Sequence, residues 1–336
     1  MGKRTMTVRT DELRLTVPFR ISGYVFEHSD AVVVTVREGA HAGRGEASGV
    51  YYTGDDAAHM LAGIESCRVA VEAGASRNEL QSLLPPGGAR NALDCALWEL
   101  EAAQRGMPVW ALAGLDAPKP LVTTFTLGAD DPDTVAAGAR RYADVKAIKL
   151  KLTGEIEADL GRVEAVRAAR PDVWLGVDAN QGFARRDLDW LVEALVEHRV
   201  SLLEQPLARG READLEGYSS PVPVAADESA LSLADVPGLV GRFDVVNIKL
   251  DKCGGLTEGL AMAAEARRLG LKVMVGNMVG TSLAMAPAWL LGQLCDYVDL
   301  DGPTFLTEDP APAAVYRDGY ISCGDEVWGG GGRLAA

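Results

Sequence analysis

Eight short apolar runs, spaced about 25 residues apart, dominate the chain from residue 118 onward. They are Leu121–Leu127, Val145–Leu150, Val173–Val177, Val200–Leu203, Pro223–Ala226, Val245–Leu250, Leu271–Val275 and Tyr297–Leu300. Stretches with helical spacing lie between them, at Ile156–Ala169, Asp187–His198 and Leu256–Leu269. Alternating strands and helices predict an α/β fold with a parallel sheet, and eight strands favour a closed (β/α)8 barrel that is imperfect at one helix. A doubly wound open sheet is the alternative, although no GxGxxG or GxxxxGK[ST] motif supports its nucleotide-binding versions.

The region before the barrel pattern has a different organisation. Polar and glycine breaks separate β-like runs, which are followed by helical patterns. The expected strands are Met6–Val17, Ala31–Val36 and Gly43–Ser48, and the expected helices are Asp55–Ala73, Ser76–Leu84 and Ala89–Arg105. We therefore predict an α+β domain over residues 1–115, a (β/α) barrel domain over 116–302, and a C-terminal segment over 303–336 that folds back on them.

The composition excludes several classes of partner. The 33 Lys and Arg residues against 48 Asp and Glu residues give a net charge of −15, which repels nucleic acid and anionic membranes. No apolar stretch is long enough to span a bilayer, and the N-terminus lacks a signal-peptide pattern, so a cytoplasmic location is expected. The five cysteines and four histidines are scattered, without CxxC or HxxxH spacing. We therefore do not expect the chemistry to depend on Cys or His.

Charged and amide side chains collect at the carboxyl ends of the expected barrel strands. Barrel enzymes keep their chemistry on that face. The residues are Lys149 and Lys151, Asp178 and Asn180, Glu204, Asp227, Lys249, and Asp299 and Asp301. A single charge at a strand end is often only solvated, but a pattern over six strands predicts an active site.

Three of these carboxylates, Asp178, Glu204 and Asp227, follow consecutive strands and can converge on one ion. Oxygen ligands alone select a hard cation, so we expect Mg²⁺, with Asn180 supporting the site. The alternative is a salt-bridge network with the lysines. It is disfavoured because three buried like charges without an ion are costly.

The second and sixth strands of an eight-strand barrel lie opposite each other, so Lys151 and Lys249 are expected to face each other across the mouth. Asp299 and Asp301 would then bind an ammonium group of a substrate whose carboxylate meets the metal. This arrangement suits proton transfer at the α-carbon, with one lysine removing the proton, the other returning it, and the metal stabilising the enediolate. The base must be neutral near pH 7, so a lowered pKa is expected, and Lys149 can stabilise the oxyanion. A Schiff-base lysine is the rival chemistry, but it leaves the carboxylates unexplained.

These residues resemble the enolase superfamily, specifically its muconate-lactonizing-enzyme-like subgroup. The matching motifs are Lys149-Leu150-Lys151, Asp178-Ala179-Asn180, Glu204-Gln205-Pro206, Asp227-Glu228-Ser229 and Asn247-Ile248-Lys249 with Gly254-Gly255, and Ala92–Leu100 resembles part of the family's N-terminal capping domain. The resemblance implies an Mg²⁺-dependent isomerase that abstracts an α-proton. Asp299-Leu300-Asp301 resembles the Asp-x-Asp of dipeptide epimerases, where the pair holds the ammonium of the dipeptide.

The chain departs from the family pattern around the expected substrate. Gly280 replaces a Glu that many dipeptide epimerases carry after the seventh strand, near Met278, and Tyr24 stands where Ala-Glu epimerases place an Arg. Without that Arg, a buried side-chain carboxylate would be poorly compensated, so Ala-Glu is not expected as the main substrate. Tyr24 and Phe26 would suit an apolar or aromatic side chain, whereas Glu27 would favour a cationic one. With Thr126 and Met278, Tyr24 is a candidate substrate-binding residue.

The function expected from this chain is therefore Mg²⁺-dependent epimerisation of a dipeptide at its C-terminal residue, by a homo-oligomeric enzyme. Other two-lysine reactions stay open: N-acylamino acid racemisation, muconate-type cycloisomerisation and o-succinylbenzoate-type dehydration. Their substrates lack an ammonium and leave Asp299 and Asp301 without a role. A non-catalytic binding protein on the same scaffold is the alternative from another class, and the intact lysine pair disfavours it.

Overall fold

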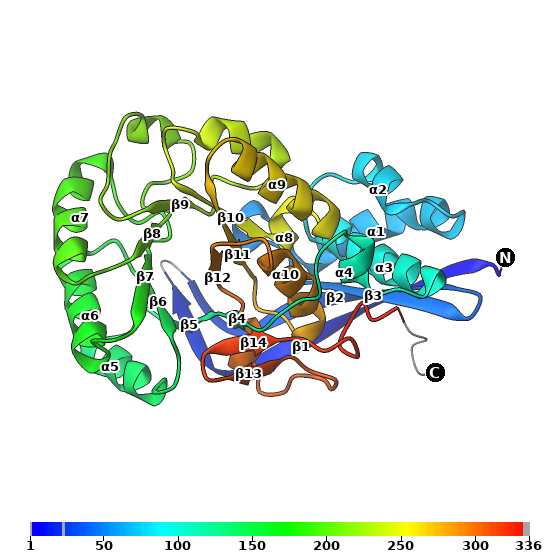
Figure 1. Ribbon diagram of the computed structural model, residues 1–336, viewed down its shortest axis with the longest axis horizontal. Helices are drawn as coiled ribbons and strands as arrows, with labels where there is room; N and C mark the ends of the chain where they lie inside the picture. Colours follow the sequence, from blue (N-terminus) through cyan, green and yellow to red (C-terminus); the bar gives the residue numbers. More distant parts are fainter. Residues whose placement is uncertain (1, 22–23, 332–336) are drawn as a thin grey trace.

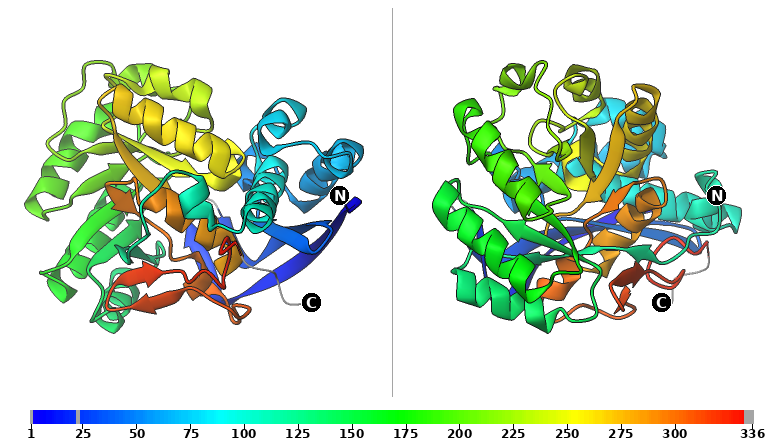
Figure 2. Two further views of the ribbon diagram at one scale, coloured as in Figure 1. Left: turned by 45° about the vertical axis from the view of Figure 1, so that its right-hand side comes forward. Right: turned by 60° about the vertical axis from the view of Figure 1, so that its left-hand side comes forward.

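The computed structural model describes residues 2–21 and 24–331 as an N-terminal α+β unit packed against a parallel eight-stranded sheet with helices (Figures 1 and 2). The N-terminal sheet is antiparallel in the order β1 (Arg4–Ile21), β2 (Tyr24–Glu38) and β3 (His41–Ala47). Its helices are α1 (Ala57–Glu72), α2 (Arg77–Leu83) and α3 (Gly88–Arg105), followed by the short α4 (Val109–Leu112). The first three helices are confirmed within two residues of their expected ends.

Helix α3 packs unusually close to β3 because two glycines face it. A Cβ atom on Gly43 would lie 2.0 Å from the carbonyl oxygen of Ala96, and one on Gly45 would lie 2.1 Å from that of Ala92. Ala92 and Ala96 are four residues apart and therefore share one face of the helix. The alternating glycines and the alanine pair together fix this contact, which buries the valines of β2 against α3.

The parallel sheet contains the eight expected strands, in chain order from one edge to the other. They are β5 (Thr124–Leu127), β6 (Ala147–Lys151), β7 (Trp174–Asp178), β8 (Leu202–Glu204), β9 (Val224–Ala226), β10 (Val245–Lys249), β11 (Lys272–Gly276) and β12 (Tyr297–Val298). The helices are α5 (Pro132–Arg141), α6 (Ile156–Ala169), α7 (Leu188–Glu197), α8 (Leu250–Cys253), α9 (Leu256–Arg268) and α10 (Ser282–Gly292). The connections after β8 and β9 contain only the 3-10 segments Glu212–Leu215 and Leu233–Leu239, so two helices are replaced rather than the one expected.

Side chains join the two edge strands of this sheet, β5 and β12. The backbone N–H of Thr126 donates to Asp301 Oδ2 at 2.6 Å, and the N–H of Leu300 donates to Thr123 Oγ1 at 2.9 Å. Thr124 donates its hydroxyl to Asp299. Polar side chains therefore supply hydrogen bonds across this seam and close the (β/α)8-type barrel.

The C-terminal segment returns to both units. Strand β14 (Tyr320–Ser322) pairs with β13 (Val315–Arg317) on one side and with β4 (Leu121–Val122) on the other. Further on, the indole N–H of Trp328 donates to the carbonyl of Arg44 in β3. The segment thus ties the barrel to the N-terminal unit, while the boundaries at residues 115 and 302 stay predictions.

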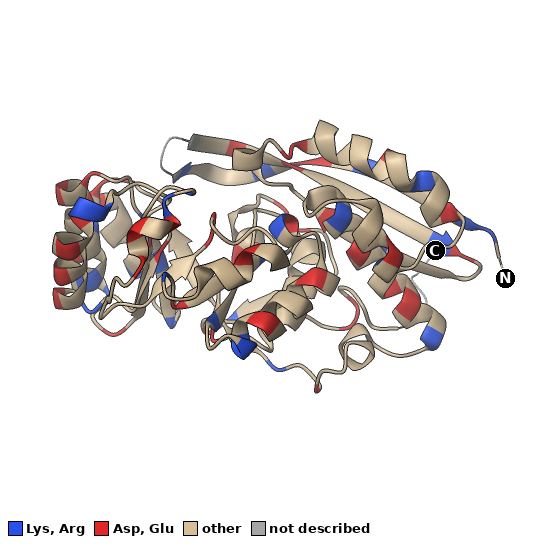
Figure 3. Ribbon diagram, turned by 90° about the horizontal axis from the view of Figure 1, so that it is seen from above, with Lys and Arg blue, Asp and Glu red and all other residues tan. Residues whose placement is uncertain are grey.

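The outer surface carries both acidic and basic side chains, in agreement with the charged composition of the sequence. Acidic and basic residues are interspersed along the outer helices (Figure 3). In the part of the chain that the structure describes, no helix is long and apolar enough to cross a membrane.

Candidate active site

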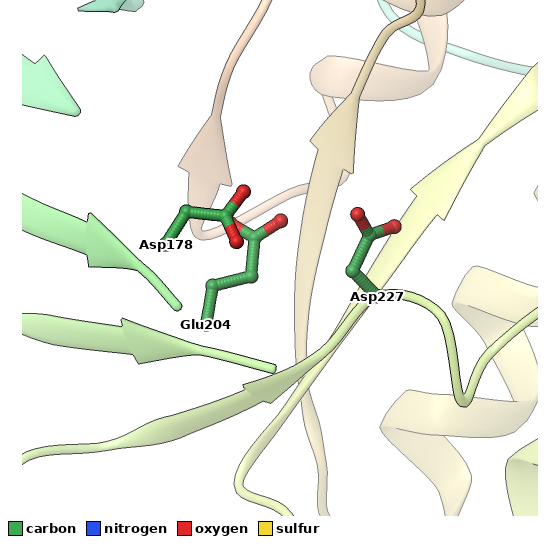
Figure 4. A group of neighbouring side chains, drawn as sticks. All are labelled: Asp178, Glu204 and Asp227. Atoms are coloured by element: carbon green, nitrogen blue, oxygen red, sulfur yellow. The ribbon is translucent and has the colours of Figure 1, made fainter. Parts of the chain in front are cut away.

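The parallel register of the barrel brings the predicted carboxylates together. Asp178 pairs with Lys151 on one side and with Glu204 on the other, so the three residues lie at one level on β6, β7 and β8. Asp227 follows β9 directly. Asp178, Glu204 and Asp227 are each at most 1% exposed and offer oxygen atoms within 4.8 Å of one another (Figure 4).

Each carboxylate has a definite cationic or amide partner. Lys151 Nζ donates to Asp178 Oδ2 at 2.6 Å, and Lys249 Nζ donates to Asp227 Oδ2 at 2.7 Å. The amide of Asn247 donates to Glu204 Oε1 at 3.0 Å. These contacts hold the carboxylates in fixed orientations at the carboxyl end of the barrel.

Neighbouring charges shift the pKa values of the three carboxyl groups in different directions. Burial alone would raise the pKa of each, but Lys149 and Lys151 hold the pKa of Asp178 well below its usual range, and Lys249 and Lys252 do the same for Asp227. Burial and the neighbouring charge of Asp178 instead raise the pKa of Glu204 to about 8. The crowded negative charge suits a bound cation, and the oxygen-only donor set suits a hard one.

Lys149 lies beneath the carboxylates rather than in the pocket. Its Nζ is 3.1 Å from Asp178 Oδ2, 2.8 Å from Glu204 Oε2 and 2.8 Å from Asp299 Oδ2. These charges raise its pKa well above the usual value even though burial opposes the shift. Lys149 therefore stays protonated beside the triad.

At Lys249 the protein's own charges act against the expected lowering of the base pKa. Burial favours neutral Lys249, but Asp227 at 2.7 Å, reinforced by Glu204 and Asp178, raises its pKa above the ordinary value. Neutralising Lys249 therefore requires that the negative charge of Asp227 be compensated by another partner.

One pocket lies between the N-terminal unit and the barrel, and both candidate catalytic lysines line it together with Asn180, Asp227 and Met278. The backbone N–H of Asn180 donates to Asp178 Oδ1 at 2.9 Å. Asn180 Oδ1 and Glu228 Oε2 are buried and have no hydrogen-bond partner among the described residues. Two polar atoms are thus available at this pocket for a ligand.

The remaining predicted substrate residues lie elsewhere. Asp299, Asp301 and Thr126 are buried at the seam between β5 and β12, outside the described pocket lining. Tyr24 begins β2, but its side chain lies outside the described residues.

Sequence reasoning missed several residues of the site. Lys252 is fully buried against Asp227, and its position three residues after Lys249, one helical turn on, was a usable signal. The side chains of Leu15, Ser29, Tyr51, Tyr52 and Val279 also line the pocket. No sequence pattern identifies the pocket residues of the N-terminal unit, because their place in the pocket depends on how the two units pack.

Comparison with known proteins agrees with this architecture. The family model described as "Mandelate racemase / muconate lactonizing enzyme, N-terminal domain" matches residues 3–114, and "Enolase C-terminal domain-like" matches residues 134–327. The chain therefore belongs to the mandelate racemase/muconate lactonizing enzyme family of the enolase superfamily.

Curated relatives include named epimerases. The chain is similar to the L-Ala-D/L-Glu epimerase of Escherichia coli, with 39% identity covering 95% of this chain and 99% of the relative. It is also similar to a hydrophobic dipeptide epimerase of Roseobacter litoralis, with 37% identity covering 95% and 96%. The resemblance to dipeptide epimerases is confirmed.

Solved structures share the whole fold. An Agrobacterium tumefaciens enolase family member with homology to dipeptide epimerases, bound to sodium and L-Ala-L-Glu, has a TM-score of 0.92 at 41% identity, covering 97% of this chain and 100% of its own. A dipeptide epimerase from Enterococcus faecalis, complexed with Mg and L-Leu-L-Tyr, has a TM-score of 0.91 at 28% identity, covering 99% of both. The (β/α)8-type fold with its N-terminal domain is therefore confirmed.

Proposed function

We propose that this protein is an Mg²⁺-dependent dipeptide epimerase that inverts the α-carbon of the C-terminal residue by proton transfer between Lys151 and Lys249. One observation carries the proposal. The two lysines come from strands β6 and β10, four places apart in an eight-stranded sheet, and line the same pocket. Each is also within 2.7 Å of a carboxylate of the acidic triad.

Asp178, Glu204 and Asp227 would hold the Mg²⁺. The fit rests on three buried carboxylates with oxygen atoms within 4.8 Å of one another, and the similar epimerase from Enterococcus faecalis was crystallised with Mg. Once bound, Mg²⁺ would supply positive charge that stabilises the enediolate form of the substrate and offsets the effect of the Asp227 charge on Lys249.

The chain's own residues move the proton. One lysine, in its neutral form, takes the α-proton on its Nζ, and the other, in its ammonium form, gives a proton to the opposite face of the same carbon. Protonated Lys149, beneath the triad, adds positive charge beside Asp178 and Glu204 while negative charge develops on the substrate carboxylate. Lys252 and Asn247 keep Asp227 and Glu204 in place while charge moves.

Asp299 and Asp301 would bind the dipeptide ammonium, as the Asp-x-Asp motif implies. Both carboxylates already accept protein hydrogen bonds: Asp299 from Lys149 and Thr124, and Asp301 from Thr126. These contacts also favour a second candidate function, racemisation of N-acylamino acids, because that substrate needs no ammonium site.

The proposal is tested by incubating the protein with pooled L,L-dipeptides and Mg²⁺ and separating the products by chiral chromatography. We expect a D-residue to accumulate at the C-terminal position and to disappear when EDTA removes the metal. Inversion of N-acetyl amino acids without inversion of any dipeptide would replace the proposal with the second candidate. Metal binding with no inversion of either substrate class would reject both.

A further inference from the structure

The N-terminal unit contributes an apolar wall to the catalytic pocket. Phe26 and Tyr51 meet edge to face with ring centroids 5.2 Å apart. The apolar and aromatic side chains that line the pocket are Leu15, Phe19, Phe26, Tyr51, Tyr52, Met278 and Val279. This wall and the two lysines line the same pocket.

The wall continues into a small hydrophobic core that joins the two units. Leu13, Leu15 and Ala31 of the β1–β2 hairpin pack with Leu306, and Phe19, Phe26, Val279 and Phe305 pack against this cluster. The rings of Phe19 and Phe305 are 4.9 Å apart. A charged substrate group placed on the aliphatic and phenylalanine side chains of this wall would lose water without gaining a countercharge from them.

The lysine side chains that line the pocket are already engaged by carboxylates, and the described lining also contains His28. Among the described residues that line it, Lys151 and Lys249 are the lysine or arginine side chains, and each is already paired with a carboxylate. The side chain of Arg20 is 56% exposed and lies 3.7 Å from Asp130. The adjoining sequence at 21–24, Ile-Ser-Gly-Tyr, contains no basic residue.

We infer that the epimerised residue of the substrate carries an apolar or aromatic side chain. The inference rests on the proposed function, because it places the α-carbon between the lysines and its side chain against the wall. Desolvating an aliphatic or aromatic side chain there is favourable, whereas a Glu side chain would be buried near Asp227 and Glu228 in a pocket whose lysines are already paired.

The test compares kcat/KM for L-Ala-L-Phe, L-Ala-L-Leu, L-Ala-L-Glu and L-Ala-L-Lys with Mg²⁺ present. We expect the Phe and Leu dipeptides to exceed both charged ones by at least about tenfold, the scale of discrimination that a hydrophobic pocket provides. Equal or faster turnover of the Glu or Lys dipeptide would overturn the inference while leaving the epimerase proposal intact. Turnover of no dipeptide would reject the epimerase proposal, and the inference with it.

A matched pair of variants tests the wall itself. Phe26→Arg introduces a cation on the wall and should shift the ratio of kcat/KM values toward L-Ala-L-Glu by about tenfold or more. Phe26→Leu keeps the wall apolar and should retain the preference for apolar dipeptides. Circular dichroism and a melting curve verify that both variants fold. An unchanged ratio in a folded Phe26→Arg protein would contradict the assignment.

Discussion

Lys252 is a buried cation at the base of the active site. Its side chain is 0% exposed and donates to Asp227 Oδ1 at 2.5 Å, to the Asp227 carbonyl at 2.6 Å and to the Asn247 carbonyl at 2.9 Å. All three acceptors would lose a partner if the ammonium were removed. Because breaking a buried ion pair leaves an uncompensated charge, this lysine is expected to matter for stability as well as for the metal site.

Lys252→Met should therefore lower the free energy of unfolding by about 3 kcal/mol. The measurement is urea denaturation followed by circular dichroism, in buffer containing EDTA so that metal affinity does not enter. Lys119→Met is the matched control: the side chain is exposed, so a change below about 0.5 kcal/mol is expected. Equal free energies of unfolding for the two variants would show that the Lys252–Asp227 contact contributes little net stability.

At the scale of single elements, helix α9 of the barrel is capped by a residue of helix α3. Its own N-cap, Gly255, has no side chain, and Asp94 instead accepts from the N–H of Thr257 at 2.9 Å and from its hydroxyl at 2.6 Å. A Cβ atom on Gly255, whose φ is 113°, would lie 2.5 Å from the Asp94 Cβ. The glycine thus makes room for the carboxylate that satisfies the start of the helix.

Asp94→Ala should cost about 1–2 kcal/mol of unfolding free energy, the usual value of an N-cap. Asp94→Asn keeps an acceptor oxygen and should lose clearly less. Urea denaturation of the two variants at one pH provides the comparison. An Asn variant as unstable as the Ala variant would show that hydrogen-bond acceptance is not the reason for the contact.

At the scale of the whole molecule, buried carboxylates join the N-terminal unit to the barrel. Glu46 of β3 accepts both the N–H and the hydroxyl of Thr281, while Asp251 of α8 accepts the N–H groups of Ser48 and Gly49. Burial, only partly opposed by the Thr281 hydrogen bonds, raises the pKa of Glu46 to about 7. The folded protein therefore binds this proton more tightly than the unfolded chain does, and stability falls as pH rises from about 4.5 to 7.

Glu46→Gln removes this titration but keeps hydrogen-bonding groups opposite Thr281. The loss of unfolding free energy between pH 5 and pH 8 should be smaller in this variant by about 2–3 kcal/mol. Denaturation curves of both proteins at several pH values measure the difference. Parallel pH profiles would mean that Glu46 does not titrate in this range.

The barrel and its triad were predictable because strand periodicity is a local property of the sequence and the carboxyl ends of parallel strands meet at one face of a barrel. Lys151, Asp178 and Glu204 end neighbouring strands and therefore had to lie side by side. The sequence predicted only part of the apolar wall around Phe26, since the other side chains of the wall come from distant segments of the chain. The contact of Asp299 with Lys149 was not predictable either, because it depends on how the edge strands β5 and β12 meet.

In the proposed mechanism, Lys151 and Lys249 act on opposite faces of one α-carbon. Solvent exchange tests it most directly: L,L- and L,D-dipeptides are incubated in D₂O with Mg²⁺, and deuterium at the C-terminal α-carbon is followed by mass spectrometry. The unaltered protein should exchange both epimers. Each single variant, Lys151→Ala or Lys249→Ala, should lose epimerisation, because one proton donor or acceptor is missing.

The two variants should differ in which epimer still exchanges, since each retains the lysine that faces the α-proton of one epimer only. The double variant should exchange neither. Exchange of the same epimer by both single variants, or exchange that survives in the double variant, would contradict the two-lysine assignment.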